Sequence, residues 1–170
     1  WGTKQQEIAL YGDVRWDPND TPESYAKRVK SYLAMAKMAG AKLHFPGNSG
    51  TQTLPVDTCI AVLRAARQAA GPDAMLAWDP HPGEAATNKE DAMRILKAME
   101  EEHYEWLEGP IPPGPEATQI PLHTEICNET TILIEPEGSG AVSTSSLNAF
   151  RVWTAAKACD QWHYDVFKAD

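Results

Sequence analysis

The sequence has no apolar run that approaches the roughly 20 residues a membrane-spanning helix requires. Basic residues are also scarce: 15 lysines and arginines stand against 24 aspartates and glutamates, so the formal net charge is −9. This charge disfavours electrostatic binding to nucleic acid or to an anionic membrane surface. We therefore expect a cytoplasmic protein that has neither nucleic acid nor a membrane as a partner.

Cysteine clusters and glycine-rich motifs are missing where a zinc site or a nucleotide site would need them. The three cysteines, Cys59, Cys127 and Cys159, form no C-x-x-C pair, so we expect reduced thiols that serve as small apolar side chains. No glycine-rich phosphate loop follows any predicted strand, which argues against nucleotide binding. A first methionine is also missing, and because the chain begins at Trp1 we expect the natural N-terminus to lie upstream.

The 170 residues are 42% hydrophobic, which is enough for one domain with a buried core. Short apolar segments typical of strands alternate along the chain with helical patterns. The predicted strands span residues 7–14, 41–44, 74–79, 104–108, 125–129 and 162–167. Repeated strand–helix units favour an α/β fold with parallel strands, either an open doubly wound sheet or an unfinished eight-stranded barrel.

Three predicted helices have a recognisable start signal. The signals are Thr21 before Pro22, Pro55, and the capping-box pair Thr87 and Glu90. Residues 109–121 hold many prolines and leave little room for a helix. Residues 132–146 are predicted to form a long loop before a last helix at 147–156.

Polar residues lie at or near the ends of the later predicted strands. They are Lys42, His44, Asp79, His81, Glu108, Glu129 and Asp165. In a parallel barrel the C-terminal ends of the strands share one face, so residues far apart in the sequence can converge there. Converging carboxylates repel each other and are costly to desolvate unless a hard cation lies between them. Asp79, Glu108 and Glu129 therefore indicate a magnesium site.

The same residues have a plainer interpretation. Polar side chains often end strands because the chain returns to water there. Asp79 would then start a turn with Pro80, and Glu108 would be a solvated strand end. The residues alone leave both interpretations open.

Several segments resemble the barrel domain of the enolase superfamily, and most of all its mandelate racemase subgroup with the acid-sugar dehydratases. They are, in order, KLHFPG, AMLAWDPHPGE, YEWLEGPIPP, ICNE and CDQWHYDVFKAD. WLEGPIPP looks like the fourth-strand motif of that subgroup, and the pair Asp160 and Asp165 looks like its sixth-strand pattern. The resemblance covers nearly the whole chain. It implies that residues 1–170 form a partial TIM (β/α) barrel of about six strand–helix units, without the N-terminal capping domain and the last strands.

The resemblance also assigns roles to single positions. Asp79, Glu108 and Glu129 match the Mg²⁺ ligands, although the usual Gly-Glu of the fifth strand would be Asn128-Glu129 here. The remaining roles are catalytic. Lys42 and His44 lie at the family's Lys-x-Lys position, and His81 matches a histidine that serves as an acid. Asp165 matches an aspartate that orients a histidine. The family's second basic residue usually exchanges protons with the substrate, and here it is His44.

The implied reaction is a hydro-lyase reaction on a small sugar acid. His44, kept neutral by the neighbouring Lys42, would remove the proton α to the carboxylate, and magnesium would stabilise the resulting enediolate. His81 would protonate the departing β-hydroxyl, leaving a 2-keto-3-deoxy acid. We further expect a homo-oligomer.

Two alternatives stay open. A racemase or cycloisomerase of the same superfamily would share the metal and the enediolate but lose no water. A truncated chain with no catalysis by itself is the other, because six of eight strands leave an open edge and exposed apolar surface.

Overall fold

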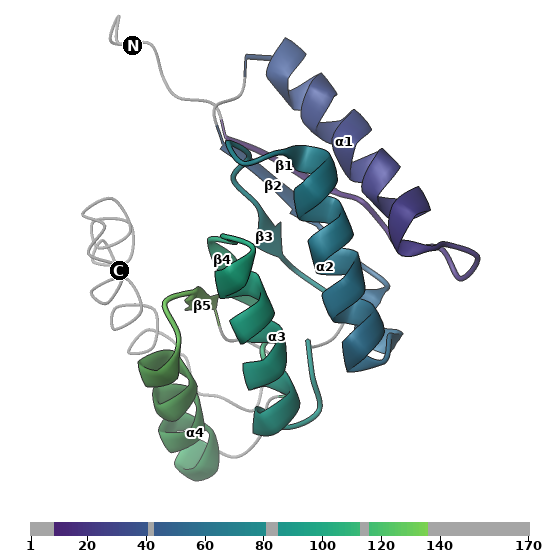
Figure 1. Cartoon of the computed structure of the whole chain (residues 1–170). Helices are drawn as coiled ribbons and strands as arrows, with labels where there is room; N and C mark the ends of the chain where they lie inside the picture. The colour runs from purple at the N-terminus through teal and green to yellow at the C-terminus, as the bar shows by residue number, and fades with distance from the viewer. Residues whose placement is uncertain (1–8, 41–42, 81–84, 113–115, 136–170) are drawn as a thin grey trace, which may run out of the picture.

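A computed structural model describes residues 9–40, 43–80, 85–112 and 116–135 (Figure 1). Its strands are β1 (Ala9–Asp13), β2 (Leu43–Gly47), β3 (Ala77–Trp78), β4 (Trp106–Glu108) and β5 (Leu133–Glu135). Its helices are α1 (Pro22–Met38), α2 (Val56–Ala70), α3 (Lys89–Glu101), α4 (Glu116–Glu129) and the short 3₁₀ turn η1 (Thr51–Thr53). Strands and helices alternate, which confirms the predicted α/β class.

All strand pairs that the structure describes are parallel. One ladder joins β1 to β2, and a second joins β3, β4 and β5 in that order. The two ladders meet where the N–H of Asn48, just after β2, donates to the carbonyl oxygen of Asp79, just after β3, at 2.8 Å. Figure 1 shows the helices in a row on one side of the strands, with α1 against α2 and α2 against α3. This is the arrangement that successive strand–helix units require.

The ends of the first two helices follow the predicted signals. Thr21 and Ser24 form a reciprocal capping box ahead of α1, and Pro22 is the first helical residue, where its missing N–H costs nothing. Helix α2 begins after Pro55 and ends before Gly71, whose φ of 85° suits glycine.

The start of α3 differs by one residue from the prediction. Its N-cap is Asn88, whose Oδ1 accepts the backbone N–H of Asp91 at 2.9 Å. Asparagine is at least as good an N-cap as threonine, so the cap falls on Asn88 instead of Thr87.

None of the helices within the described residues is long and apolar enough to cross a membrane.

The core lies between the strands and the row of helices. Trp78 of β3, Leu107 of β4 and Ile134 of β5 are each at most 2% exposed and belong to one hydrophobic cluster. The helices contribute Leu63, Ile95, Leu96 and Met99 to the same cluster. The apolar face of α3 is therefore part of the core.

The prediction of a fifth strand at residues 125–129 is wrong, because these residues form the last part of α4. The buried positions His123, Ile126, Cys127 and Thr130 are spaced i, i+3, i+4 and i+7, which is helical periodicity. The helix also continues through Pro121, although prolines were expected to leave little room for one. The strand β5 lies further on, in a segment predicted to be loop.

The first four strands have different bounds from the predicted ones. Strand β1 ends one residue earlier, at Asp13, and β2 runs on through Pro46 to Gly47. Strand β3 is reduced to two residues, and β4 begins two residues later, at Trp106. The predicted sixth strand at 162–167 and the last helix at 147–156 lie outside the described residues.

Candidate metal centre

Three acidic positions end neighbouring strands in register. In the ladder between β3 and β4, Trp78 pairs with Leu107, so the next residues along are Asp79 and Glu108. In the ladder between β4 and β5, Glu108 pairs with Glu135. Paired positions of a parallel ladder lie on the same face of the sheet. The backbone thus brings positions 79, 108 and 135 together at the C-terminal ends of three adjacent strands.

These positions lie on the face turned away from the helices. Their neighbours Trp78, Leu107 and Ile134 form the buried row of the helix-side core, and successive residues of a strand alternate between faces. Asp79 is 6% exposed, whereas Glu108 is half-buried. A carboxylate as buried as that of Asp79 has to be compensated by hydrogen bonds, by an opposite charge or by a metal.

The backbone of Asp79 is held on both sides by Asn48. The Asp79 N–H donates to Asn48 Oδ1 at 3.1 Å, and the Asn48 N–H donates to the Asp79 carbonyl oxygen at 2.8 Å. These two bonds place the end of β3 against the end of β2. The first of the predicted ligands therefore has a defined backbone position.

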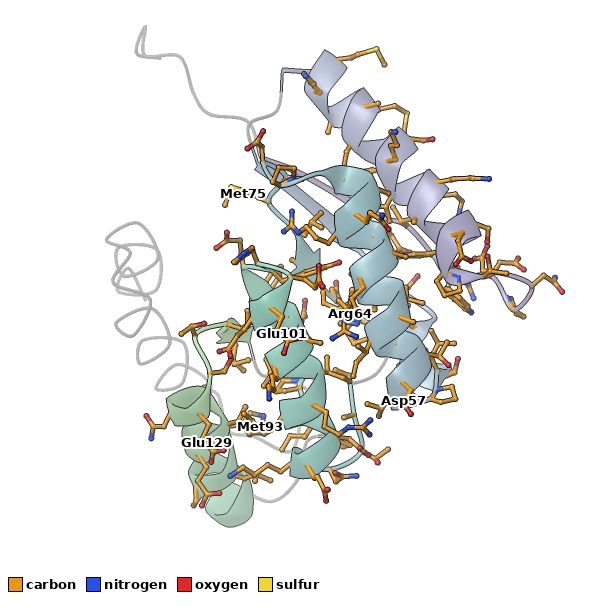
Figure 2. The ribbon with its side chains drawn as sticks, in the orientation of Figure 1. Asp57, Arg64, Met75, Met93, Glu101 and Glu129 are labelled. Atoms are coloured by element: carbon orange, nitrogen blue, oxygen red, sulfur yellow. The ribbon has the colours of Figure 1, made fainter. Side chains whose placement is uncertain are left out.

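Glu129 lies elsewhere. It is the last residue of α4, it is exposed, and its Oε1 accepts a hydrogen bond from Lys89 Nζ at 2.7 Å (Figure 2). Lys89 also donates to Glu125 at 3.0 Å, and the two carboxylates, Glu129 first, raise the pKa of the lysine. The strand end on which Glu129 was predicted to act as a metal ligand does not exist. This correction follows from the helical assignment of residues 125–129.

His44 lies in the ladder between β1 and β2, where it pairs with Leu10. It lies four positions before Asn48, and four positions along a strand span about 13 Å. The ladder therefore does not bring His44 level with Asp79. Lys42, His81 and Asp165 lie outside the described residues.

Glu135 was missed by the sequence analysis. The signal for it was the apolar run Ile132–Leu133–Ile134 directly before an acidic residue, the same pattern that precedes Glu108 in β4. Glu137 follows two residues later and lies outside the described residues. Among the side chains that the structure describes, no three of His, Cys, Asp or Glu lie close enough to hold a metal, and the side chain of Glu135 is not one of them.

The donor set fits a hard divalent cation. Aspartate and glutamate supply only oxygen ligands, and magnesium is usually bound by one or two carboxylates while it keeps positions for water or substrate. Asp79, Glu108 and Glu135 are therefore the residues that could hold the metal.

Comparison with known proteins identifies the family. The family of enolase C-terminal domain-like proteins matches residues 24–170, and the chain belongs to this family. None of the curated proteins matches the chain.

Solved structures share the fold at low sequence identity. A putative mandelate racemase from Bordetella bronchiseptica RB50, complexed with 2-oxoglutarate/phosphate, matches with a TM-score of 0.65 at 18% identity, over 96% of this chain and 42% of its own. The 3,6-anhydro-D-galactonate cycloisomerase from Zobellia galactanivorans matches with a TM-score of 0.59 at 19% identity, over 89% of this chain and 36% of its own.

A third structure contains magnesium. It is the dipeptide epimerase from Enterococcus faecalis V583, complexed with Mg and the dipeptide L-Leu-L-Tyr, with a TM-score of 0.55 at 18% identity, over 77% of this chain and 32% of its own. The chain thus spans between a third and somewhat over two fifths of the length of these three proteins. The three are described as a putative mandelate racemase, a cycloisomerase and a dipeptide epimerase.

Proposed function

We propose that the protein is a magnesium-dependent dehydratase of sugar acids that begins by removing the proton α to a carboxylate. The observation that supports this most directly is the row of acidic positions, Asp79, Glu108 and Glu135, in register on one face of β3, β4 and β5. Membership of the enolase family and the magnesium in a related fold agree with it.

Asp79, Glu108 and Glu135 would hold the metal ion. Magnesium at this place supplies positive charge that stabilises the negative charge developing on the substrate carboxylate. Glu129 has no part in this proposal, because it is paired with Lys89 on the helical layer.

The proton steps fall to side chains of the chain itself. His44 removes the α-proton, and Lys42, two residues earlier, keeps the imidazole neutral so that it can act as a base near pH 7. His81, two residues after Asp79, protonates the leaving β-hydroxyl. Asp165 would orient a histidine, which is the role that the resemblance assigns to its position.

A racemase or cycloisomerase is the second candidate, and the related structures named above favour it. It would use the same carboxylates and the same proton abstraction, but the substrate would keep its hydroxyl groups. The short span of the chain relative to those structures supports a third outcome, in which the chain binds metal but needs further strands for catalysis.

The test is incubation of the protein with Mg²⁺ and a panel of sugar acids in deuterated water, followed by NMR. A dehydratase forms a 2-keto-3-deoxy acid that carries solvent deuterium at C3, where the enol takes up a proton as it becomes the ketone. Deuterium incorporation with inversion and no loss of water indicates a racemase. Metal binding without any exchange contradicts catalysis by this chain.

A further inference from the structure

Asn48 joins three separate elements through its buried side chain. The residue is 2% exposed and follows β2 directly. Its Nδ2 donates to the hydroxyl oxygen of Tyr25 on α1 at 2.5 Å, and its Oδ1 accepts the N–H of Asp79 at 3.1 Å. One amide group thus connects α1, the end of β2 and the end of β3.

The partners of Asn48 are themselves fixed. Tyr25 is fully buried and packs against Trp16, with 5.6 Å between the ring centroids. Burial raises the pKa of Tyr25, so its hydroxyl stays neutral at any working pH. The backbone carbonyl oxygen of Asn48 accepts the N–H and the hydroxyl of Thr51 at 3.2 and 2.6 Å. The backbone of Asn48 and the tyrosine hydroxyl that its Nδ2 contacts are therefore both held in place.

The loop that carries Asn48 is also tied to the end of β1. Ser49 Oγ donates to Asp13 Oδ2 at 2.5 Å, and the Trp16 N–H donates to the Ser49 carbonyl oxygen at 2.8 Å. Gly50 has a φ of 87°, and a Cβ there would lie 3.0 Å from the Trp16 carbonyl oxygen. This close packing keeps the loop in one conformation, so Asn48 presents its Oδ1 at a constant place.

We propose that Asn48 is a positioning residue for the metal centre and sets the metal affinity of Asp79 through the hydrogen bond that its Oδ1 accepts from the Asp79 N–H. The inference rests on the proposed function, because it takes Asp79 to be a metal ligand. Asn48 itself supplies no ligand in this arrangement, since its Oδ1 and Nδ2 are already engaged by Asp79 and Tyr25. Its contribution is the backbone position from which the Asp79 carboxylate reaches the ion.

The test compares two substitutions that remove different hydrogen bonds of the network around Asn48. Asn48→Ala removes the two side-chain bonds, to the Asp79 N–H and to Tyr25, and keeps the backbone bond to the Asp79 carbonyl oxygen, whereas Tyr25→Phe removes only the bond to Tyr25. Both variants should lower the stability measured by urea unfolding. Only Asn48→Ala should weaken Mn²⁺ binding measured by calorimetry, by about 10–100-fold, as is typical when a group that orients a metal ligand is lost. Tyr25→Phe should stay within about twofold of the wild type.

A milder variant and a metal-free measurement keep the outcome clear. Asn48→Ser retains a small polar group in the buried site but is too short to reach the Asp79 N–H. In amide exchange followed by NMR without metal, Asn48→Ser should expose the Asp79 amide, whereas Tyr25→Phe should leave it protected. Wild-type Mn²⁺ affinity in folded Asn48→Ala or Asn48→Ser overturns the inference.

Failure of the proposed function gives a different pattern of Mn²⁺ binding from failure of this inference. Asp79→Asn separates the two cases, because it should abolish Mn²⁺ binding if Asp79 is a ligand. If the wild type and Asp79→Asn bind Mn²⁺ equally, Asp79 is no ligand, and the proposed function and this inference both fall. If Asp79→Asn loses the metal and Asn48→Ala does not, the inference alone falls.

Discussion

Glu108 and Glu135 are paired residues of the parallel ladder between β4 and β5, and each is the last residue of its strand. Together with Asp79 at the end of β3, they give three adjacent strands an acidic C-terminal end on one face. Asp79 is almost fully buried, so its carboxylate has to be compensated. Under the proposed function, the three positions would share one cation.

The first prediction concerns which glutamates bind the metal. Glu108→Gln and Glu135→Gln should each weaken Mg²⁺ binding at least about tenfold in calorimetry, because each removes a charged oxygen ligand. Glu129→Gln is the matched control and should change the affinity less than about twofold, since Glu129 is paired with Lys89 on the helical layer. Glu137→Gln tests the acidic residue that follows β5. A loss in Glu129→Gln as large as that in Glu108→Gln would contradict this account.

The second prediction concerns the base. His44→Ala should abolish exchange of the substrate α-proton with deuterated water while leaving Mg²⁺ affinity close to that of the wild type, because His44 is not a ligand. NMR of the substrate provides the measurement. This is a stringent test, because His44 lies about 13 Å along β2 from Asn48, which contacts the proposed metal ligand Asp79. Exchange that continues in the variant would place the base on another residue.

The third prediction concerns how β5 is held. Glu100 Oε1 accepts hydrogen bonds from Thr130 Oγ1 at 2.7 Å and from the Thr131 N–H at 2.5 Å, in the turn that leads into β5. Charge-assisted bonds of this kind contribute about 1.5–3 kcal/mol, so Glu100→Gln should lower the free energy of unfolding by about 1–2 kcal/mol.

The neighbouring glutamate is the control for that substitution. Glu101 pairs with Arg64 on the surface at 3.0 Å, and its side chain is 50% exposed. Glu101→Gln should cost less than about 1 kcal/mol in the same urea titration. Equal losses in Glu100→Gln and Glu101→Gln would mean that the turn before β5 does not depend on the bonds to Glu100.

The fourth prediction concerns acid stability. Hydrogen bonds from Arg28 are the main reason why the pKa of Asp20 lies far below its usual range, and bonds from Asp17 and Ser24 add to the effect. A carboxyl group with a lowered folded-state pKa stabilises the fold above its unfolded pKa of about 4, and this contribution is lost as the pH falls toward the folded value.

Asp20→Asn measures this contribution directly. At pH 7 the variant should be less stable than the wild type by about 1 kcal/mol, because Arg28 is partly exposed to solvent. The difference should shrink as the pH falls below about 4. Asp73→Asn, at an exposed position between α2 and β3, is the control and should change the free energy of unfolding by less than about 0.5 kcal/mol at pH 7. A difference for Asp20→Asn that does not depend on pH would contradict the role of its charge.

Local signals were sufficient for the first three strand–helix units. The cap at Thr21, the helix end at Gly71 and the apolar strand before Asp79 each follow from interactions within a few residues, and such interactions can be inferred from sequence. The burial of Trp78 also follows from its place in an apolar strand between two helices.

The second half was harder because local and tertiary signals disagree there. Pro121 argues against a helix, but the buried stripe of Ile126 and Cys127 compensates for its missing N–H by packing α4 against the core. Assigning residues 125–129 to a strand then made Glu129 a strand-end ligand and left Glu135 in a loop. The ladder pairing of Glu108 with Glu135 depends on contacts between distant segments, which no local pattern states.

The central claim is that acidic residues from the ends of β3, β4 and β5 share one divalent cation. A crystal structure of the protein grown with Mg²⁺, with Mn²⁺ as an anomalous marker, tests it most directly. We expect one ion with carboxylate oxygens of Asp79, Glu108 and Glu135 at about 2.0–2.1 Å for magnesium, and Glu129 still paired with Lys89. An ion held by Glu129, or no ion at these strand ends, would contradict the account.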